Sequence, residues 1–117
     1  MTHDAKRVPA RFYLQEGTGN EPVRDWLLGL PKPDRRKIGV DIKTVEYGWP
    51  VGMPTCRHLQ KGVWEVRTDL DGNRLSRVLF CMSDGQMILL HGFIKKTKAT
   101  PSEDLDLAIK RMKEMKK

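Results

Sequence analysis

The apolar positions in the first half of the chain recur at helical spacing. One stripe follows Pro22, a residue favoured at the first position of a helix because its missing N–H would have no partner there. Its members stand at i, i+3, i+4 and i+7, and they are Val23, Trp26, Leu27 and Leu30. A second stripe, Ile38, Ile42 and Val45, predicts a helix from about Asp34 to Gly48. Before both helices, the mixed stretch from residue 7 to 15 predicts a short strand.

The second half of the chain has the pattern of strands joined by tight turns. Three runs, at residues 63–68, 74–82 and 86–94, are separated by two turns that each carry Asp-Gly, a strong hairpin signal. Two successive hairpins predict a three-stranded antiparallel meander. The segment 100–103 (TPSE) then matches a capping box and predicts a last helix. The apolar side of that helix is Leu105, Ala108, Ile109, Met112 and Met115.

Together these elements predict an α+β fold. In it, an antiparallel sheet, made of the meander and the N-terminal strand, packs against two N-terminal helices and a C-terminal helix. The length of 117 residues fits a single domain over residues 1–117. No run approaches the roughly 18 apolar residues of a membrane span, and no apolar signal segment begins the chain. We therefore expect a cytoplasmic protein without membrane contact.

The net charge of the chain indicates a class of binding partner. The chain holds 22 Lys and Arg against 15 Asp and Glu, for a formal net charge of +7. Residues 57–117 contribute 13 basic and 8 acidic residues, so +5 of that excess lies in the predicted sheet and last helix. A basic excess on a well-formed core pattern favours a polyanion, and nucleic acid is the expected one.

Several classes of chemistry lack their motifs in this sequence. There is no HExxH, no CxxC, no Gly-rich phosphate loop and no GxSxG turn. Cys56 and Cys81 are the only cysteines, and we expect both to be reduced and buried. We therefore expect no metal site and no cofactor. The chemistry-bearing groups that remain are cations on the predicted strands.

Because side chains alternate between the two faces of a strand, three charged side chains, Glu65, Arg67 and Arg77, are expected on one face. If the first hairpin is symmetric about Asp71, Glu65 lies opposite Arg77 and Arg67 lies opposite Leu75. An arginine in an apolar strand is costly to bury without a partner. Either Arg77 pairs across the strands with Glu65, or it stands in an open concave face and holds a phosphate. The two roles are compatible, because a carboxylate can orient an arginine that also contacts substrate.

The third strand brings further cations to the same edge of the sheet. Arg77 would face Gly92 if the second hairpin has a two-residue loop, and His91 if the loop has three residues. The sequence leaves both registers open. In either register, Lys95 and Lys96 follow at the end of the strand.

Three stretches of this sequence resemble the RelE/ParE toxin superfamily, and within it the phage-derived, HigB-type branch. They are residues 59–67 (LQKGVWEVR), Arg77 ahead of Val-Leu-Phe, and residues 90–101 (LHGFIKKTKATP). The resemblance implies a RelE-like toxin of a type II toxin–antitoxin pair, which cuts mRNA on the ribosome without a metal or a cofactor. It also implies a helix-turn-helix antitoxin as partner, and operator DNA bound only through the complex of the two.

The resemblance assigns roles to individual residues. Arg77 matches the arginine that contacts the scissile phosphate, and Lys95 and Lys96 match basic positions after the last strand. A lysine among other cations is a candidate general base, because its charged form is disfavoured there. Relatives often place a catalytic aromatic or histidine near the C-terminus, where this chain has only KEMKK, so His91 is kept as an alternative proton carrier. The candidate catalytic residues are Arg77, Lys95, Lys96 and His91; the candidate substrate-binding residues are Arg67, Lys61, Lys98 and His58.

Two other functions compete with mRNA cleavage. A ParE-like toxin that inhibits DNA gyrase would share the fold but would not need the catalytic cations. A noncatalytic RNA-binding module would use the same basic face, with exposed aromatic rings for base stacking. Trp49 and Trp64 are the residues left for that purpose, since Trp26 and Phe80 are expected in the core.

Overall fold

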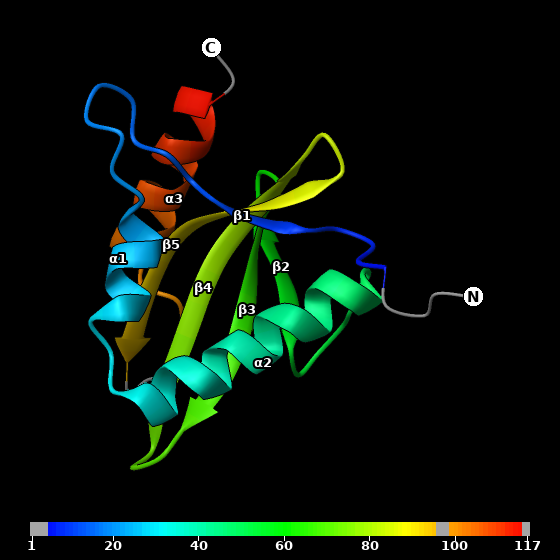
Figure 1. Ribbon diagram of the computed structural model, residues 1–117, viewed down its shortest axis with the longest axis vertical. Helices are drawn as coiled ribbons and strands as arrows, with labels where there is room; N and C mark the ends of the chain where they lie inside the picture. The colour runs from blue at the N-terminus through cyan, green and yellow to red at the C-terminus, as the bar shows by residue number, and fades with distance from the viewer. Residues whose placement is uncertain (1–4, 96–98, 116–117) are drawn as a thin grey trace.

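A computed structural model of the protein describes residues 5–95 and 99–115. In that part of the chain, five strands form one sheet in the order β1-β5-β4-β3-β2 (Figure 1). All neighbouring strands are antiparallel except β1 and β5, which run parallel, so the prediction of an antiparallel sheet was wrong for the N-terminal strand. The elements are β1 (Ala10–Phe12), α1 (Pro22–Leu28), α2 (Lys32–Gly48), β2 (Cys56–Gln60), β3 (Val63–Leu70), β4 (Arg74–Ser83), β5 (Gln86–Lys95) and α3 (Ser102–Met115). The predicted α+β fold class is confirmed.

The sheet has one strand that the sequence did not predict. β2 pairs with β3 at the edge of the sheet, and of its five residues only Cys56 is buried. An edge strand with so little apolar burial lacks the alternation of apolar and polar residues by which a strand is predicted from sequence. At the opposite edge, β1 is only three residues long, inside the predicted stretch from 7 to 15. Both N-terminal helices are confirmed, and α2 begins at Lys32, two residues earlier than expected.

The first hairpin has a different register from the expected one. Arg67 lies directly opposite Arg77, and Glu65 lies opposite Leu79. The prediction centred the turn on Asp71, but the loop has three residues, and its last two, Gly72 and Asn73, have φ of 77° and 59°. The shift is by two residues, so every side chain keeps its face. Glu65, Arg67 and Arg77 therefore share one face, as predicted.

The second hairpin has the two-residue loop that was one of the two alternatives, with positive φ at both residues 84 and 85. A bulge then leaves Leu90 as an extra residue on β5. Beyond the bulge the pairing moves by one residue, and Arg77 lies opposite Phe93. Both expected partners, Gly92 and His91, were wrong, because a bulge inside a strand is invisible to an argument from loop length.

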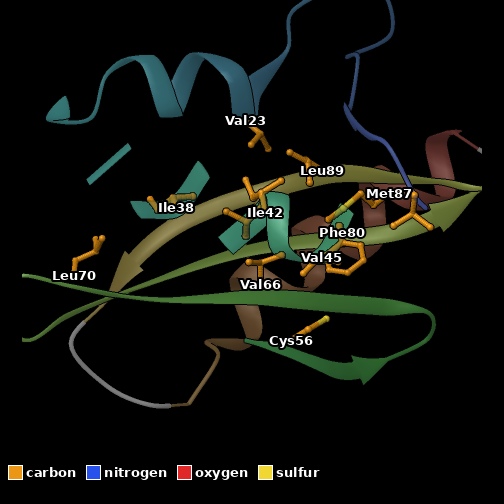
Figure 2. Packing of buried hydrophobic residues seen from close by; sticks show 12 residues of the cluster. Val23, Ile38, Ile42, Val45, Cys56, Val66, Leu70, Phe80, Met87 and Leu89 are labelled. Atoms are coloured by element: carbon orange, nitrogen blue, oxygen red, sulfur yellow. The ribbon is translucent and has the colours of Figure 1, made fainter. Parts of the chain in front are cut away.

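The helices cover the two faces of the sheet unequally. α1 and α2 lie across one face, where Figure 2 shows Val23, Ile38 and Val45 pointing toward Val66 and Phe80 of the sheet. α3 lies on the other face, mainly over β5 and β4 (Figure 1). Its predicted apolar stripe is confirmed, since all five residues belong to or pack against the core on that face. The β3 and β2 part of this second face is left more open.

The approach to α3 departs from the predicted capping box. The hydroxyl of Thr100 donates a hydrogen bond to Glu65 Oε1 at 2.7 Å, so it reaches the sheet instead of capping the helix. The polypeptide just before α3 is thereby joined to the middle of β3. Both cysteines are buried and neither forms a disulfide, as expected.

Candidate functional site

A buried carboxylate joins the two opposed arginines of β3 and β4. Glu65 is completely buried, and its Oε2 accepts a hydrogen bond from Arg67 Nη1 at 2.9 Å. The other oxygen, Oε1, accepts the bond from Thr100 and lies 3.7 Å from Arg77 Nε. That last distance is an ion pair but is too long for a hydrogen bond. The two guanidinium groups are thus held on one face by a single negative charge.

The guanidinium of Arg77 keeps donor capacity that the described residues do not use. Only 1% of the residue is exposed, and its Nη1 donates to the carbonyl of Ser76 at 2.8 Å. Its Nε has no hydrogen-bond partner among the residues that the structure describes. Burial lowers the pKa of Arg77, and the neighbouring charge of Arg67 lowers it further. Arg77 therefore has a donor that a further hydrogen-bond acceptor could use.

Both arginines line a hollow that an anion could enter. Its volume is about 490 Å³, within the range of small-molecule sites. Two carboxylates, Asp41 of α2 and Asp69 of β3, also reach its wall, so the hollow is polar but not uniformly basic. The lining residues are Asp41, Pro54, Thr55, Arg67, Asp69, Leu75 and Arg77. We call this space the arginine hollow.

Lys95 stands beside this hollow. It lies directly opposite Leu75, a lining residue, on the same face as Arg77. Its ammonium group donates to the carbonyl of Ala99 and lies 5.8 Å from the centroid of the Phe93 ring. Burial lowers the pKa of Lys95, followed by the positive charge of Arg77. These influences favour the neutral amine that a general base requires.

His91 lies on the same face but is engaged with α3. Its Nε2 is 2.6 Å from Oδ1 of Asp104 in the first turn of α3, and its ring stacks on Phe93 with centroids 5.4 Å apart. Because Phe93 is opposite Arg77, His91 is one step further along the sheet from the arginines. The pair with Asp104 fixes the orientation of the ring.

The other predicted binding residues are not gathered at the arginine hollow. Lys61 is exposed in the turn between β2 and β3, six residues or about 20 Å along the strand from Arg67. His58 belongs to the opposite face, where its ring lies 4.7 Å from that of Trp64. Lys96 and Lys98 lie outside the described residues.

Three residues at or near the arginine hollow were not singled out by the sequence analysis. Arg57 of β2 lies opposite Glu65 and therefore on its face, a position that strand parity would have given had β2 been recognised. Thr100 was assigned to a helix cap, which concealed its bond to Glu65. For Asp41, on the middle of α2, no pattern in the sequence indicates a place beside the arginines.

The two tryptophans considered for base stacking, Trp49 and Trp64, pack against the core instead. The rings of Trp49 and Trp64 meet edge to face with centroids 4.9 Å apart, and both pack against the core under α2. Trp64 belongs to the face opposite the arginine hollow, because it pairs with Phe80. The noncatalytic RNA-binding alternative therefore loses the platform on which it depended.

Two further features bear on chemistry and location. Among residues 5–95 and 99–115, no three His, Cys, Asp or Glu side chains come together in an arrangement that could hold a metal ion. None of the helices in the described part of the chain is long and apolar enough to cross a membrane.

This sheet, flanked by helices on both faces and carrying paired strand arginines, is consistent with the RelE-like α+β fold. Residues 25–113 match the family described as phage-derived protein Gp49-like (DUF891), and the chain belongs to this family. The family is part of the RelE/HigB-like group of toxins, and its members are commonly toxins of toxin–antitoxin systems, which implies an antitoxin partner. Comparison with curated proteins gives no match.

Proposed function

We propose that the protein is an endoribonuclease toxin that cuts mRNA at the arginine hollow. The observation that carries the proposal is the direct opposition of Arg67 and Arg77, which line one hollow, with the donors of Arg77 only partly used. Two guanidinium groups facing one hollow suit a phosphodiester, whose non-bridging oxygens accept bidentate hydrogen bonds.

The proposed reaction uses the nucleophile that RNA itself carries. The 2′-oxygen attacks the adjacent phosphorus, an O2′–P bond forms, the P–O5′ bond breaks, and the products are a 2′,3′-cyclic phosphate and a 5′-hydroxyl. One proton leaves the 2′-hydroxyl and another reaches the 5′-oxygen. Arg67 and Arg77 stabilise the negative charge that grows on the phosphorane, and that gain is larger in the transition state than in the ground state.

Lys95 is the proposed general base of this reaction. Burial lowers its pKa, and it lies directly opposite Leu75, a residue that lines the arginine hollow. His91 is the second candidate, but its Nε2 is already bound to Asp104. Lys96 stays a candidate catalytic residue, and Lys98, Lys61 and His58 stay candidates for contacts with more distant parts of the substrate.

The proposed biological setting follows from the family. We propose a HigB-type toxin that acts on mRNA at the translating ribosome, without a metal ion or cofactor. A helix-turn-helix antitoxin would neutralise it, and the complex of both would bind operator DNA. The net charge of +7 supports association with RNA. It favours ribosome-bound and free RNA equally.

The test is to add the purified protein to a translation reaction and to map the 5′ ends of the mRNA. The wild type should create new 5′ ends, and their formation should fall at least 100-fold in Arg67→Ala and Lys95→Ala, since each loses one stabilising or proton-transferring group. Arg24→Ala is the matched control, because it removes an exposed arginine from α1. Thermal unfolding verifies that each variant is folded.

Two outcomes would contradict the proposal. Intact mRNA combined with loss of gyrase-dependent supercoiling would favour the ParE-like alternative. Tight RNA binding without new 5′ ends under translating conditions would favour a noncatalytic RNA-binding protein.

A further inference from the structure

A second hollow lies on the same face of the sheet as the arginine hollow. It is bounded by the edge strand β2 on one side and by the start of α3, with the residues before it, on the other. Its volume is about 250 Å³. The lining residues are Arg57, Leu59, Gln60, Ala99, Thr100 and Leu105. We call it the Arg57 hollow.

Glu65 joins the two hollows. Its Oε2 accepts the hydrogen bond from Arg67, which lines the arginine hollow, and its Oε1 accepts the bond from Thr100, which lines the Arg57 hollow. Arg57 lies directly opposite Glu65 in the β2–β3 ladder. Its charge is close enough to contribute to the lowered pKa of Arg77, after burial and Arg67. The two hollows are therefore adjacent parts of one surface.

The chemistry of the Arg57 hollow differs from that of its neighbour. It has one exposed guanidinium, one carboxamide from Gln60 and the apolar side chains of Leu59 and Leu105. The carboxylates of the arginine hollow are absent from its lining. A nucleotide requires this combination: a cation for its phosphate, an apolar surface for the face of its base, and a group that both donates and accepts hydrogen bonds at the base edge.

We propose that the Arg57 hollow binds the nucleotide that adjoins the scissile dinucleotide of a single-stranded RNA, one step beyond the two nucleotides that flank the scissile phosphate. Arg57 contacts the phosphate of that nucleotide, and its base lies against Leu59 and Leu105 within reach of the Gln60 amide. This assignment rests on the proposed function, because it places the scissile phosphate in the arginine hollow. The protein would then contact at least three consecutive nucleotides.

The test measures how binding depends on the length of the RNA. The probes are oligonucleotides in which 2′-deoxyribose at the scissile position prevents cleavage, beginning with a dinucleotide and extended by one nucleotide on either side. For the wild-type protein, extension on one of the two sides should strengthen binding at least tenfold. Arg57→Ala should bind the dinucleotide normally and lose this gain, whereas Arg24→Ala should keep it. When the added nucleotide lacks its base, the logarithm of the gain in affinity should be less than half of its value for a complete nucleotide.

Failure of this inference is distinguishable from failure of the proposed function. If Arg57→Ala shows the full gain, if neither extension strengthens wild-type binding, or if the abasic extension acts like the complete one, the Arg57 hollow is not a nucleotide subsite. If Arg67→Ala cuts mRNA as fast as the wild type, the proposed cleavage site itself is wrong, whatever the length dependence shows. Because Arg57 is exposed, its replacement should leave the unfolding temperature within a few degrees of the wild-type value.

Discussion

Arg67 and Arg77 face each other directly across β3 and β4, and the buried carboxylate of Glu65 contacts both. Like charges directly opposite in a ladder destabilise a sheet, and burial of Arg77 adds a cost of desolvation. Glu65 offsets part of both costs. Asp41 and Asp69 also line the hollow, so its attraction for a phosphate depends on the hydrogen-bond donors of the two arginines more than on a net positive charge.

Removing the charge of Glu65 should destabilise the protein. Glu65→Gln keeps the shape of the side chain but removes the buried counter-charge that contacts both Arg67 and Arg77. We expect a loss of about 3 kcal/mol in the free energy of unfolding, as for other buried pairs that lose one partner. Urea unfolding at neutral pH measures this loss. Asp106→Asn, an exposed change on α3, is the control and should stay within about 0.5 kcal/mol. Equal stabilities of the two variants would contradict the role given to Glu65.

The pH dependence of cleavage tests Lys95 as the base. A base acts in its deprotonated form, so the rate should rise with pH through the pKa of Lys95. Burial and the charge of Arg77 lower that pKa, and Arg67 contributes in the same direction. In Arg67→Ala the residual activity should therefore need a higher pH to reach its plateau. The measurement is single-turnover cleavage across the pH range, with Arg24→Ala as control. An unchanged profile in Arg67→Ala would remove Lys95 from the proposed role.

The packing of α1 depends on a glycine in β5. A Cβ atom at Gly92 would lie 2.4 Å from two ring atoms of Trp26, closer than any real contact allows. Gly92→Ala should therefore cost about 1–3 kcal/mol through overpacking. Gly39→Ala is a matched control inside α2, where nothing lies within 4 Å, and it should stabilise the protein by up to about 1 kcal/mol. Urea unfolding of both variants measures the difference, and a stabilised Gly92→Ala would show that α1 does not pack as described.

Acid should weaken the attachment of α2 to the first hairpin. Both oxygens of the buried Asp34 carboxylate accept hydrogen bonds from Arg74, at 2.7 and 2.9 Å. These bonds lower the pKa of Asp34. The stabilisation is therefore complete above the unfolded-state pKa, about 3.9, and is lost as the pH falls through the lower folded-state pKa. Asp34→Asn should be less stable at neutral pH and lose less stability on acidification.

Melting temperatures between pH 3 and pH 7 provide that comparison. Asp106→Asn serves again as control and should keep the slope of the wild type. If Asp34→Asn loses as much stability in acid as the wild type does, this ion pair is not a source of the acid sensitivity.

The sequence predicted those features of the fold that depend on periodicity. The apolar stripes placed three helices, and Asp-Gly turns placed the meander, because burial on one face imposes a period that the residues display. β2 was missed because an edge strand with one buried residue displays no period. The two registers were wrong because a three-residue loop and the bulge at Leu90 depend on local backbone conformation, which side-chain patterns do not report.

The candidate site was predictable in part for the same reason. Parity placed Arg67, Arg77 and Glu65 on one face, and that result is insensitive to a register shift of two residues. Parity could not place Thr100, since its hydroxyl reaches β3 from 35 residues away along the chain. His58 is separated from the arginines because it has the wrong parity in a strand that had not been recognised.

The most direct test of the central claim is the chemistry of the ends that the protein creates on mRNA. The purified protein is added to ribosomes translating a message that carries a single 2′-deoxynucleotide at the mapped cleavage site, alongside the same message with ribose there. We expect the ribose message to yield fragments with a 5′-hydroxyl end, and the deoxy message to stay intact at that site. Cleavage of both messages, or 5′-phosphate ends on the fragments, would contradict attack by the 2′-oxygen on a phosphate held between Arg67 and Arg77.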